Sequence, residues 1–155
     1  MKNWQKALVS IIGCEAVGLL GTPFTLNAIP DWYMYLNKPL FAPPNWLFGP
    51  AWALLYFLMG VAIYRIWIMK PSKKTKEAIN YFIAQLSLNF IWTPIFFGLR
   101  SPVIGLAVII SMWFMILFTI KKFLSVDKLA GYLLFPYLAW VTFATMLNAA
   151  IVILN

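Results

Sequence analysis

The chain alternates long apolar stretches with short polar ones. Five stretches are long enough to cross a bilayer as helices, which takes roughly 20 predominantly apolar residues. They cover residues 7–26, 47–69, 79–98, 103–120 and 129–154. A membrane barrel would instead show alternating segments of about ten residues. The pattern therefore predicts an all-α integral membrane protein, with one five-transmembrane-helix bundle domain over residues 1–155.

The connection at residues 27–46 differs from the other connections, which are short turns. It carries Pro30, Pro39, Pro43 and Pro44, and proline does not fit the interior of a continuous helix. The same segment is rich in aromatic side chains, namely Trp32, Tyr33, Tyr35 and Phe41. We expect a Pro/aromatic-rich loop that folds as a lid over the end of the bundle.

Composition agrees with a lipid environment, because 63% of the residues are hydrophobic and only 10% are charged. The net charge of +8 does not indicate a nucleic-acid partner, since the cations cluster between the apolar runs. All 12 Lys and Arg residues except Lys38 and Arg100 fall on the N-terminal side of the predicted bundle. Cations gather in cytoplasmic loops, so we expect a cytoplasmic N-terminus and a C-terminus outside.

The chain has no histidine and one cysteine, Cys14. This composition excludes a disulfide, a structural zinc site and a histidine-based catalytic triad. We expect no metal and no cofactor.

Polar and aromatic side chains align on one face of three predicted helices, at helical spacing. Amides in hydrocarbon cost free energy unless they are paired, so these faces should turn inward. There they can bond to each other or to a flat aromatic guest. The three stripes are Trp52, Tyr56, Met59 and Ile63; Gln85, Asn89, Trp92 and Phe96; and Tyr137, Trp140, Ala144, Leu147, Asn148 and Ile151.

A purely structural interpretation stays open for any one of these residues. Trp and Tyr form belts at membrane interfaces, and Asn or Gln often only hold helices together. The first stretch raises the same question. Its Glu15 is either protonated or paired with an amide such as Gln85 or Asn148, and its ridge of Ser10, Cys14, Gly18 and Gly21 favours close helix packing.

The motifs, taken together, resemble the translocator protein family, also called tryptophan-rich sensory protein or peripheral benzodiazepine receptor. The likeness extends over nearly the whole chain in the same order. It rests on Trp32-Tyr33, Leu36-Asn-Lys-Pro39, Pro43-Pro44, Trp52, Leu55-Tyr56, Leu88-Asn-Phe-Ile-Trp-Thr-Pro-Ile-Phe-Phe-Gly98, Pro136-Tyr-Leu-Ala-Trp140, Phe143-Ala144-Thr145 and Leu147-Asn148.

The resemblance implies a homodimeric bundle in a bacterial cell membrane, whose cavity binds porphyrins such as protoporphyrin IX or related hydrophobic molecules. It also implies a link to tetrapyrrole and stress responses. Stripes and resemblance together give as candidate ligand-binding residues Trp32, Trp52, Tyr56, Asn89, Trp92, Phe96, Tyr137, Trp140, Ala144, Leu147 and Asn148.

Three functions remain in competition. The first is a membrane receptor or carrier for porphyrin-type ligands. The second is an enzyme that degrades porphyrin with light and oxygen, in which the resemblance makes Trp52 and Trp140 the catalytic residues. The third is a membrane interaction scaffold whose cavity is incidental.

Overall fold

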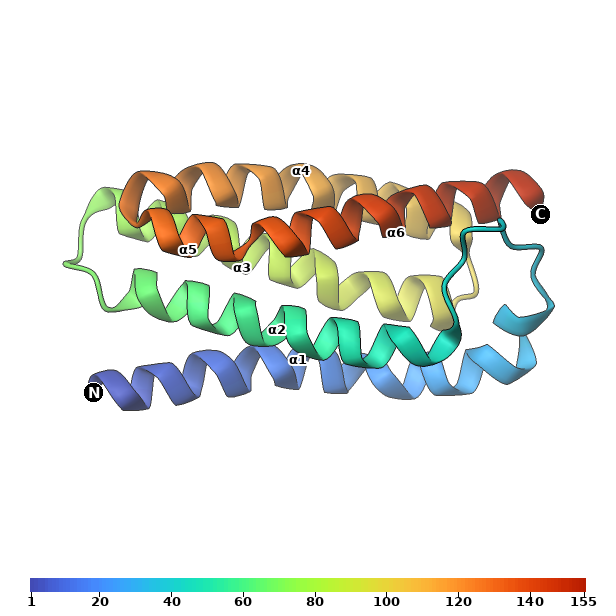
Figure 1. Ribbon diagram of the computed structural model, residues 1–155, viewed down its shortest axis with the longest axis horizontal. Helices are drawn as coiled ribbons and strands as arrows, with labels where there is room; N and C mark the ends of the chain where they lie inside the picture. Colours follow the sequence, from blue (N-terminus) through green and yellow to red (C-terminus); the bar gives the residue numbers. More distant parts are fainter.

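The computed structural model describes residues 1–155, and its regular structure is entirely helical. Long helices lie side by side along one axis, and the two termini lie at opposite ends of the bundle (Figure 1). The α-helices are α1 (Asn3–Asp31), α2 (Asn45–Trp67), α3 (Lys73–Thr93), α4 (Pro102–Val126), α5 (Lys128–Leu133) and α6 (Phe135–Leu154). Two short helices complete the chain, a 3₁₀-helix η1 (Tyr33–Tyr35) and a π-helix η2 (Pro94–Gly98).

Four segments are long and apolar enough to cross a membrane: α1, α2, α4, and α5 with α6 taken together. Their outward faces carry large exposed hydrophobic side chains, among them Leu8, Leu19, Leu54 and Phe114. Such surfaces suit lipid rather than water. The chain is therefore an integral membrane protein. The helix α3 is missing from this set because its first turns carry Lys73, Lys74, Lys76 and Glu77 and its interior carries amides.

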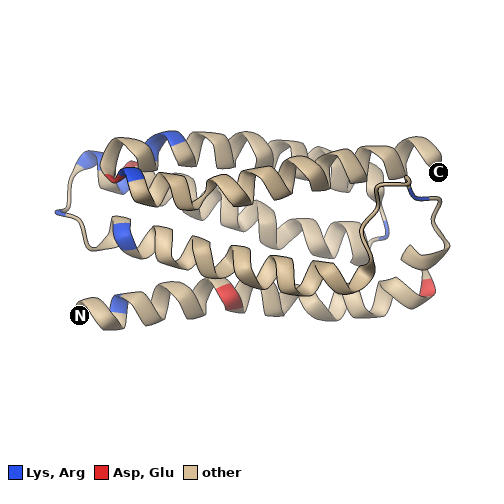
Figure 2. Ribbon diagram, in the orientation of Figure 1, with Lys and Arg blue, Asp and Glu red and all other residues tan.

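Most of the cations gather at the end of the bundle that holds the N-terminus, and few lie at the opposite end (Figure 2). Two ion pairs tie helices together at the basic end. Arg65 of α2 pairs with Asp127, which precedes α5. Lys122 of α4 lies 3.1 Å from a carboxylate oxygen of Glu77 in α3.

The first helix is longer than the sequence pattern predicted. It ends at Asp31, so the loop is 32–44 rather than 27–46, and the expectation that Pro30 lies outside a helix was wrong. Pro30 sits in the last turn, where it removes only its own N–H bond to the preceding turn. The helix still closes, because the N–H of Trp32 donates to the carbonyl of Ala28 at 2.9 Å.

The basic connections are also more helical than predicted. Most of the expected 70–77 turn forms the start of α3, since Ser72 caps that helix by accepting a hydrogen bond from the N–H of Thr75 at 3.2 Å. The expected 121–128 turn is mostly the end of α4, which continues to Val126. Hydropathy locates apolar residues, and a helix continues beyond them wherever its polar ends reach water.

Proline accounts for two interruptions within the predicted spans. Pro94 has no N–H to continue α3, and the chain widens into η2, in which the N–H of Leu99 donates to the carbonyl of Pro94 at 2.9 Å. Pro136 also lacks an N–H, and it lies in the first turn of α6, directly after the break at Leu134 that separates α5 from α6. The two pieces still follow one another in line (Figure 1), and together they form the expected 129–154 stretch.

The small-residue ridge of α1 packs within the chain, which the sequence left open. A Cβ atom on Gly18 would lie 2.5 Å from the ring of Tyr56 in α2, and one on Gly60 of α2 would lie 2.6 Å from the Cα atom of Ile11. The side chains of α1 donate or accept no hydrogen bond with another helix, and Lys6 over the Trp67 ring is its polar contact at the basic end. Close packing alone therefore holds α1 along most of its length.

A cavity lined by aromatic side chains

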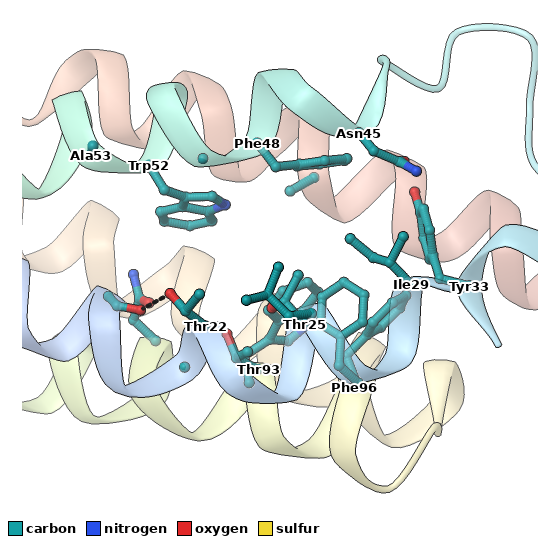
Figure 3. Close-up of a pocket in the computed structure, with 18 of the residues that line it drawn as sticks. Thr22, Thr25, Ile29, Tyr33, Asn45, Phe48, Trp52, Ala53, Thr93 and Phe96 are labelled. Atoms are coloured by element: carbon teal, nitrogen blue, oxygen red, sulfur yellow. Dashed lines mark hydrogen bonds between the residues drawn. The ribbon is translucent and has the colours of Figure 1, made fainter. Parts of the chain in front are cut away.

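One cavity of about 370 Å³ lies between α1, α2, α3, η2 and α6, at the half of the bundle that carries the long loop. Its volume falls in the range of small-molecule sites, roughly 300–1,000 Å³. Trp52 and Phe48 project from α2 toward Thr22, Thr25 and Ile29 of α1 across the opening (Figure 3). The lining is mainly hydrophobic, which suits an apolar guest.

Aromatic rings form the walls of this cavity. Trp52 stacks on Tyr56 at 5.6 Å between ring centroids and meets Trp140 edge to face at 6.3 Å. On the η2 side, Trp92 stacks on Phe96 at 4.9 Å. Each ring is thus held by a neighbouring ring, so the walls offer fixed faces against which a flat aromatic molecule can stack.

A chain of hydrogen bonds supports the inner end of the cavity. The hydroxyl of Tyr56 donates to Oδ1 of Asn89 at 2.6 Å, and Nδ2 of Asn89 donates to the hydroxyl of Tyr137 at 2.7 Å. The hydroxyl of Tyr137 in turn donates to Oε1 of Gln85 at 2.7 Å. These bonds join α2, α3 and α6 through buried side chains. They pair buried groups that would otherwise be costly.

Asn148 makes a second polar link nearer the loop. Its Oδ1 accepts a hydrogen bond from Nε1 of Trp92 at 3.2 Å, and its Nδ2 donates to the carbonyl of Pro102 at 2.8 Å. The amide therefore fixes the orientation of the Trp92 indole and ties α6 to the start of α4.

Two buried polar atoms have no hydrogen-bond partner, and both belong to residues that line the cavity. They are the hydroxyl oxygen of Tyr33 and Nε1 of Trp140. Burial raises the pKa of the Tyr33 phenol to about 12, so this hydroxyl stays neutral at physiological pH. Both groups therefore keep a hydrogen-bond donor that the chain does not use.

The three predicted stripes converge on this cavity, and nine of the eleven candidate residues line it. Trp32 and Tyr137 do not. Trp32 packs edge to face on Phe96 at 5.5 Å, and Tyr137 lies fully buried, where it holds Asn89. Contact of the lining residues with a ligand stays a prediction. The lining residues among the candidates are Trp52, Tyr56, Asn89, Trp92, Phe96, Trp140, Ala144, Leu147 and Asn148.

The sequence interpretation missed the contribution of α1, to which it assigned packing. Gly18, Thr22, Thr25 and Ile29 recur at intervals of four, three and four residues and line one wall of the cavity. Most side chains on that face are small and weakly polar, so they leave room between α1 and the rings of α2. The spacing was a usable signal, but it carries no aromatic side chain to draw attention to it.

Glu15 also lines the cavity, at its inner end. Of the two alternatives that the sequence left for Glu15, protonation or pairing with an amide, the pairing with Gln85 or Asn148 does not occur. The amide of Gln85 bonds to Tyr137 and Met59, and the amide of Asn148 bonds to Trp92 and Pro102. The Glu15 carboxyl makes no hydrogen bond and no ion pair within the chain.

The loop is fastened at the other end of the cavity. Nζ of Lys38 donates to the carbonyls of Tyr33, Met34 and Leu36 at 3.0–3.4 Å and lies 4.8 Å from the centre of the Tyr33 ring. Asn37 exchanges hydrogen bonds with Asn155 beyond α6, including one of 2.9 Å from Nδ2 of Asn155 to the carbonyl of Asn37. These contacts hold Tyr33 at the end of the cavity.

Fold and site together define a helical membrane protein with a cavity lined by aromatic side chains. Residues 10–154 match the TspO/MBR family, and the chain belongs to this family.

Its relatives come from archaea, bacteria and animals. The chain is 43% identical to "Tryptophan-rich protein TspO" of Archaeoglobus fulgidus over 99% of both chains. It is 40% identical to "Tryptophan-rich sensory protein" of Cereibacter sphaeroides, over 99% of this chain and 93% of the relative. It is 35% identical to "Translocator protein" of Homo sapiens, over 91% of this chain and 82% of the relative.

Proposed function

We propose that this chain is a membrane receptor or carrier that binds porphyrin-type ligands, and other flat hydrophobic aromatic molecules, in the cavity between α1, α2, α3 and α6. The observation that carries this proposal is the placement of Trp52, Trp92 and Trp140 around one cavity. A flat ring system gains roughly 0.5–1.5 kcal/mol from each good aromatic contact beyond the burial of its area. The names of the relatives, which describe a sensor and a translocator, support a receptor or carrier role.

The proposal includes five membrane crossings, with α3 as the fifth. α3 and η2 together run from Lys73 to Gly98 and lie alongside the four apolar helices (Figure 1). Two of the three amides of α3, Gln85 and Asn89, are buried against its neighbours. A polar helix can cross lipid when its polar groups are satisfied inside the bundle. We also propose that the chain forms a homodimer, as its resemblance to the family implies.

Titration with protoporphyrin IX in the dark tests the binding function. We expect saturable quenching of tryptophan fluorescence in protein purified in a non-ionic detergent. The Trp52→Phe and Trp140→Phe variants lose the larger indole ring, so each should weaken binding by about 1 kcal/mol, close to fivefold. The matched control is Trp113→Phe, because Trp113 bonds to Thr142 away from the cavity. Unaltered affinity in both cavity variants would show that porphyrin binds elsewhere.

The fastened loop gives a kinetic prediction. Lys38→Met removes the bonds to three loop carbonyls, and we expect protoporphyrin IX to dissociate about fivefold faster, corresponding to roughly 1 kcal/mol of lost hydrogen bonding. Stopped-flow displacement measures this rate. Lys74→Met at the basic end is the control, and an equal effect of both substitutions would rule out a lid role for the loop.

Orientation follows from the distribution of charge, since cations resist translocation. In a Cys14→Ser background, we expect a membrane-impermeant maleimide to label Leu40→Cys in intact cells. Lys74→Cys should react only after permeabilisation. Leu40 and Lys74 are both exposed; Leu40 lies in the long loop and Lys74 in the first turn of α3, and these two segments lie at opposite ends of the bundle (Figure 1). The reverse labelling pattern would invert the proposed topology.

Light- and oxygen-dependent breakdown of the bound porphyrin is a second candidate function. It is favoured by the two indoles of Trp52 and Trp140, which lie 6.3 Å apart at the cavity wall and can be oxidised. Illumination of the complex distinguishes the two functions. Loss of the porphyrin spectrum that depends steeply on both indoles supports degradation, whereas binding without turnover supports a receptor or carrier.

A further inference from the structure

Glu15 is the one acidic residue within the apolar part of the bundle. The chain has four Asp and Glu residues. Glu77 and Asp127 are paired with cations, and Asp31 is exposed at the end of α1. Glu15 lies 12 positions after the start of α1, about 18 Å along a helix of roughly 43 Å. An ionisable group at that depth is costly unless something pairs with it.

No group of the protein serves as that partner. The lining contains no Lys or Arg. The nearby hydroxyl of Tyr56 already donates its hydrogen to Asn89, and Asn89 donates onward to Tyr137. Gly18, one turn along α1, presents no side chain. The Glu15 carboxyl is thus left facing the cavity with its acceptor capacity unused.

The walls around Glu15 favour a cation in the guest. Glu15 lines the same cavity as the stacked rings of Tyr56 and Trp52, and the faces of aromatic rings attract positive charge. An aromatic enclosure with one unpaired carboxylate suits a protonated amine or another N–H group attached to a flat ring. In apolar surroundings a charge pair of this kind is less costly than an isolated carboxylate.

We propose that Glu15 is a ligand-binding residue that accepts a hydrogen bond from a basic nitrogen or N–H group of the guest, so that the cavity selects flat aromatic bases. This inference rests on the proposed function and narrows its ligand class. The central N–H groups of a free-base porphyrin are one form of such a donor. Tyr33, at the loop end of the cavity, keeps a hydroxyl without a hydrogen-bond partner in the chain.

Two probes of matching shape test the role of Glu15. The first is 9-aminoacridine, a three-ring aromatic that is cationic at neutral pH, and the second is 9-methylanthracene, its uncharged counterpart. Affinities are measured by fluorescence in a non-ionic detergent for the wild-type chain, Glu15→Gln and the control Asp31→Asn. Glutamine keeps the size of the side chain and removes the charge, and binding of 9-methylanthracene reports whether the cavity is intact.

We expect Glu15→Gln to weaken 9-aminoacridine binding at least tenfold and to change 9-methylanthracene binding less than twofold. Asp31→Asn should leave both affinities unchanged. Equal 9-aminoacridine affinity in the wild-type chain and Glu15→Gln overturns the inference while leaving the proposed function intact. An equal loss of affinity for both probes also overturns the inference, since Glu15 then affects the shape of the cavity and does not interact with the charge of the ligand. If the wild-type chain binds none of the three ligands, 9-aminoacridine, 9-methylanthracene and protoporphyrin IX, the proposed function is overturned as well.

Discussion

Replacing Asn89 by leucine is expected to lower the free energy of unfolding by about 1–3 kcal/mol, because the variant loses two buried hydrogen bonds. The hydroxyl of Tyr56 loses its acceptor and the hydroxyl of Tyr137 loses its donor. Both hydroxyls remain buried inside the bundle, and leucine offers neither of them a partner. Unfolding by sodium dodecyl sulfate in mixed micelles, followed by circular dichroism, measures the loss.

Asn80→Leu is the matched control for this experiment. Asn80 lies on the same helix, is exposed and makes no side-chain hydrogen bond. Its replacement should leave stability unchanged or raise it slightly in an apolar solvent. Equal stability of the two variants would mean that the hydrogen-bond chain does not hold α2, α3 and α6 together.

Gly60→Ala is expected to cost about 1–3 kcal/mol through overpacking. The added methyl carbon would lie 2.6 Å from the backbone of Ile11, and backbone cannot rotate away as a side chain can. The substitution therefore pushes α1 from α2 and changes the width of the cavity. We expect lower stability in the same unfolding assay and at least fivefold weaker binding of protoporphyrin IX.

Gly13→Ala provides the comparison within α1. A Cβ atom at Gly13 meets nothing within 4 Å, and alanine favours helix over glycine by roughly 0.5–1 kcal/mol. This variant should be as stable as the wild-type chain or slightly more so. If Gly60→Ala behaves like Gly13→Ala, the contact between α1 and α2 is not as tight as the structure indicates.

The sequence predicted the helices and the inward stripes well because both depend on periodicity. Trp52, Asn89 and Trp140 were placed on inward faces by their spacing to neighbouring aromatic and amide residues, and all three line the cavity. The spacing of residues along a helix does not show, however, whether each of them reaches the cavity or lies buried beyond its end. Tyr137 shares a stripe with Trp140 but lies one turn further from the loop, where it is enclosed by other side chains.

Other features depend on energies that a hydropathy pattern does not contain. The pattern treated Pro30 as a boundary, although a proline in the last turn removes only one hydrogen bond. The wall built by α1 was missed because glycine and threonine shape a cavity by leaving space. The isolation of Glu15 could not be predicted either, since Gln85 and Asn148 were available partners until the structure showed their other bonds.

The packing of α1 makes ligand affinity depend on whether the protein lies in a bilayer or in a detergent micelle. α2, α3, α4 and α6 are joined by hydrogen bonds between side chains or to backbone, whereas α1 meets them mainly through van der Waals contact. A ligand thicker than the slot between α1 and α2 must displace α1 outward into the surrounding lipid. Its affinity therefore includes work done against the lateral pressure of the bilayer. The same ligand should bind with different affinity in a tightly packed bilayer and in a soft micelle, while thin ligands bind alike in both.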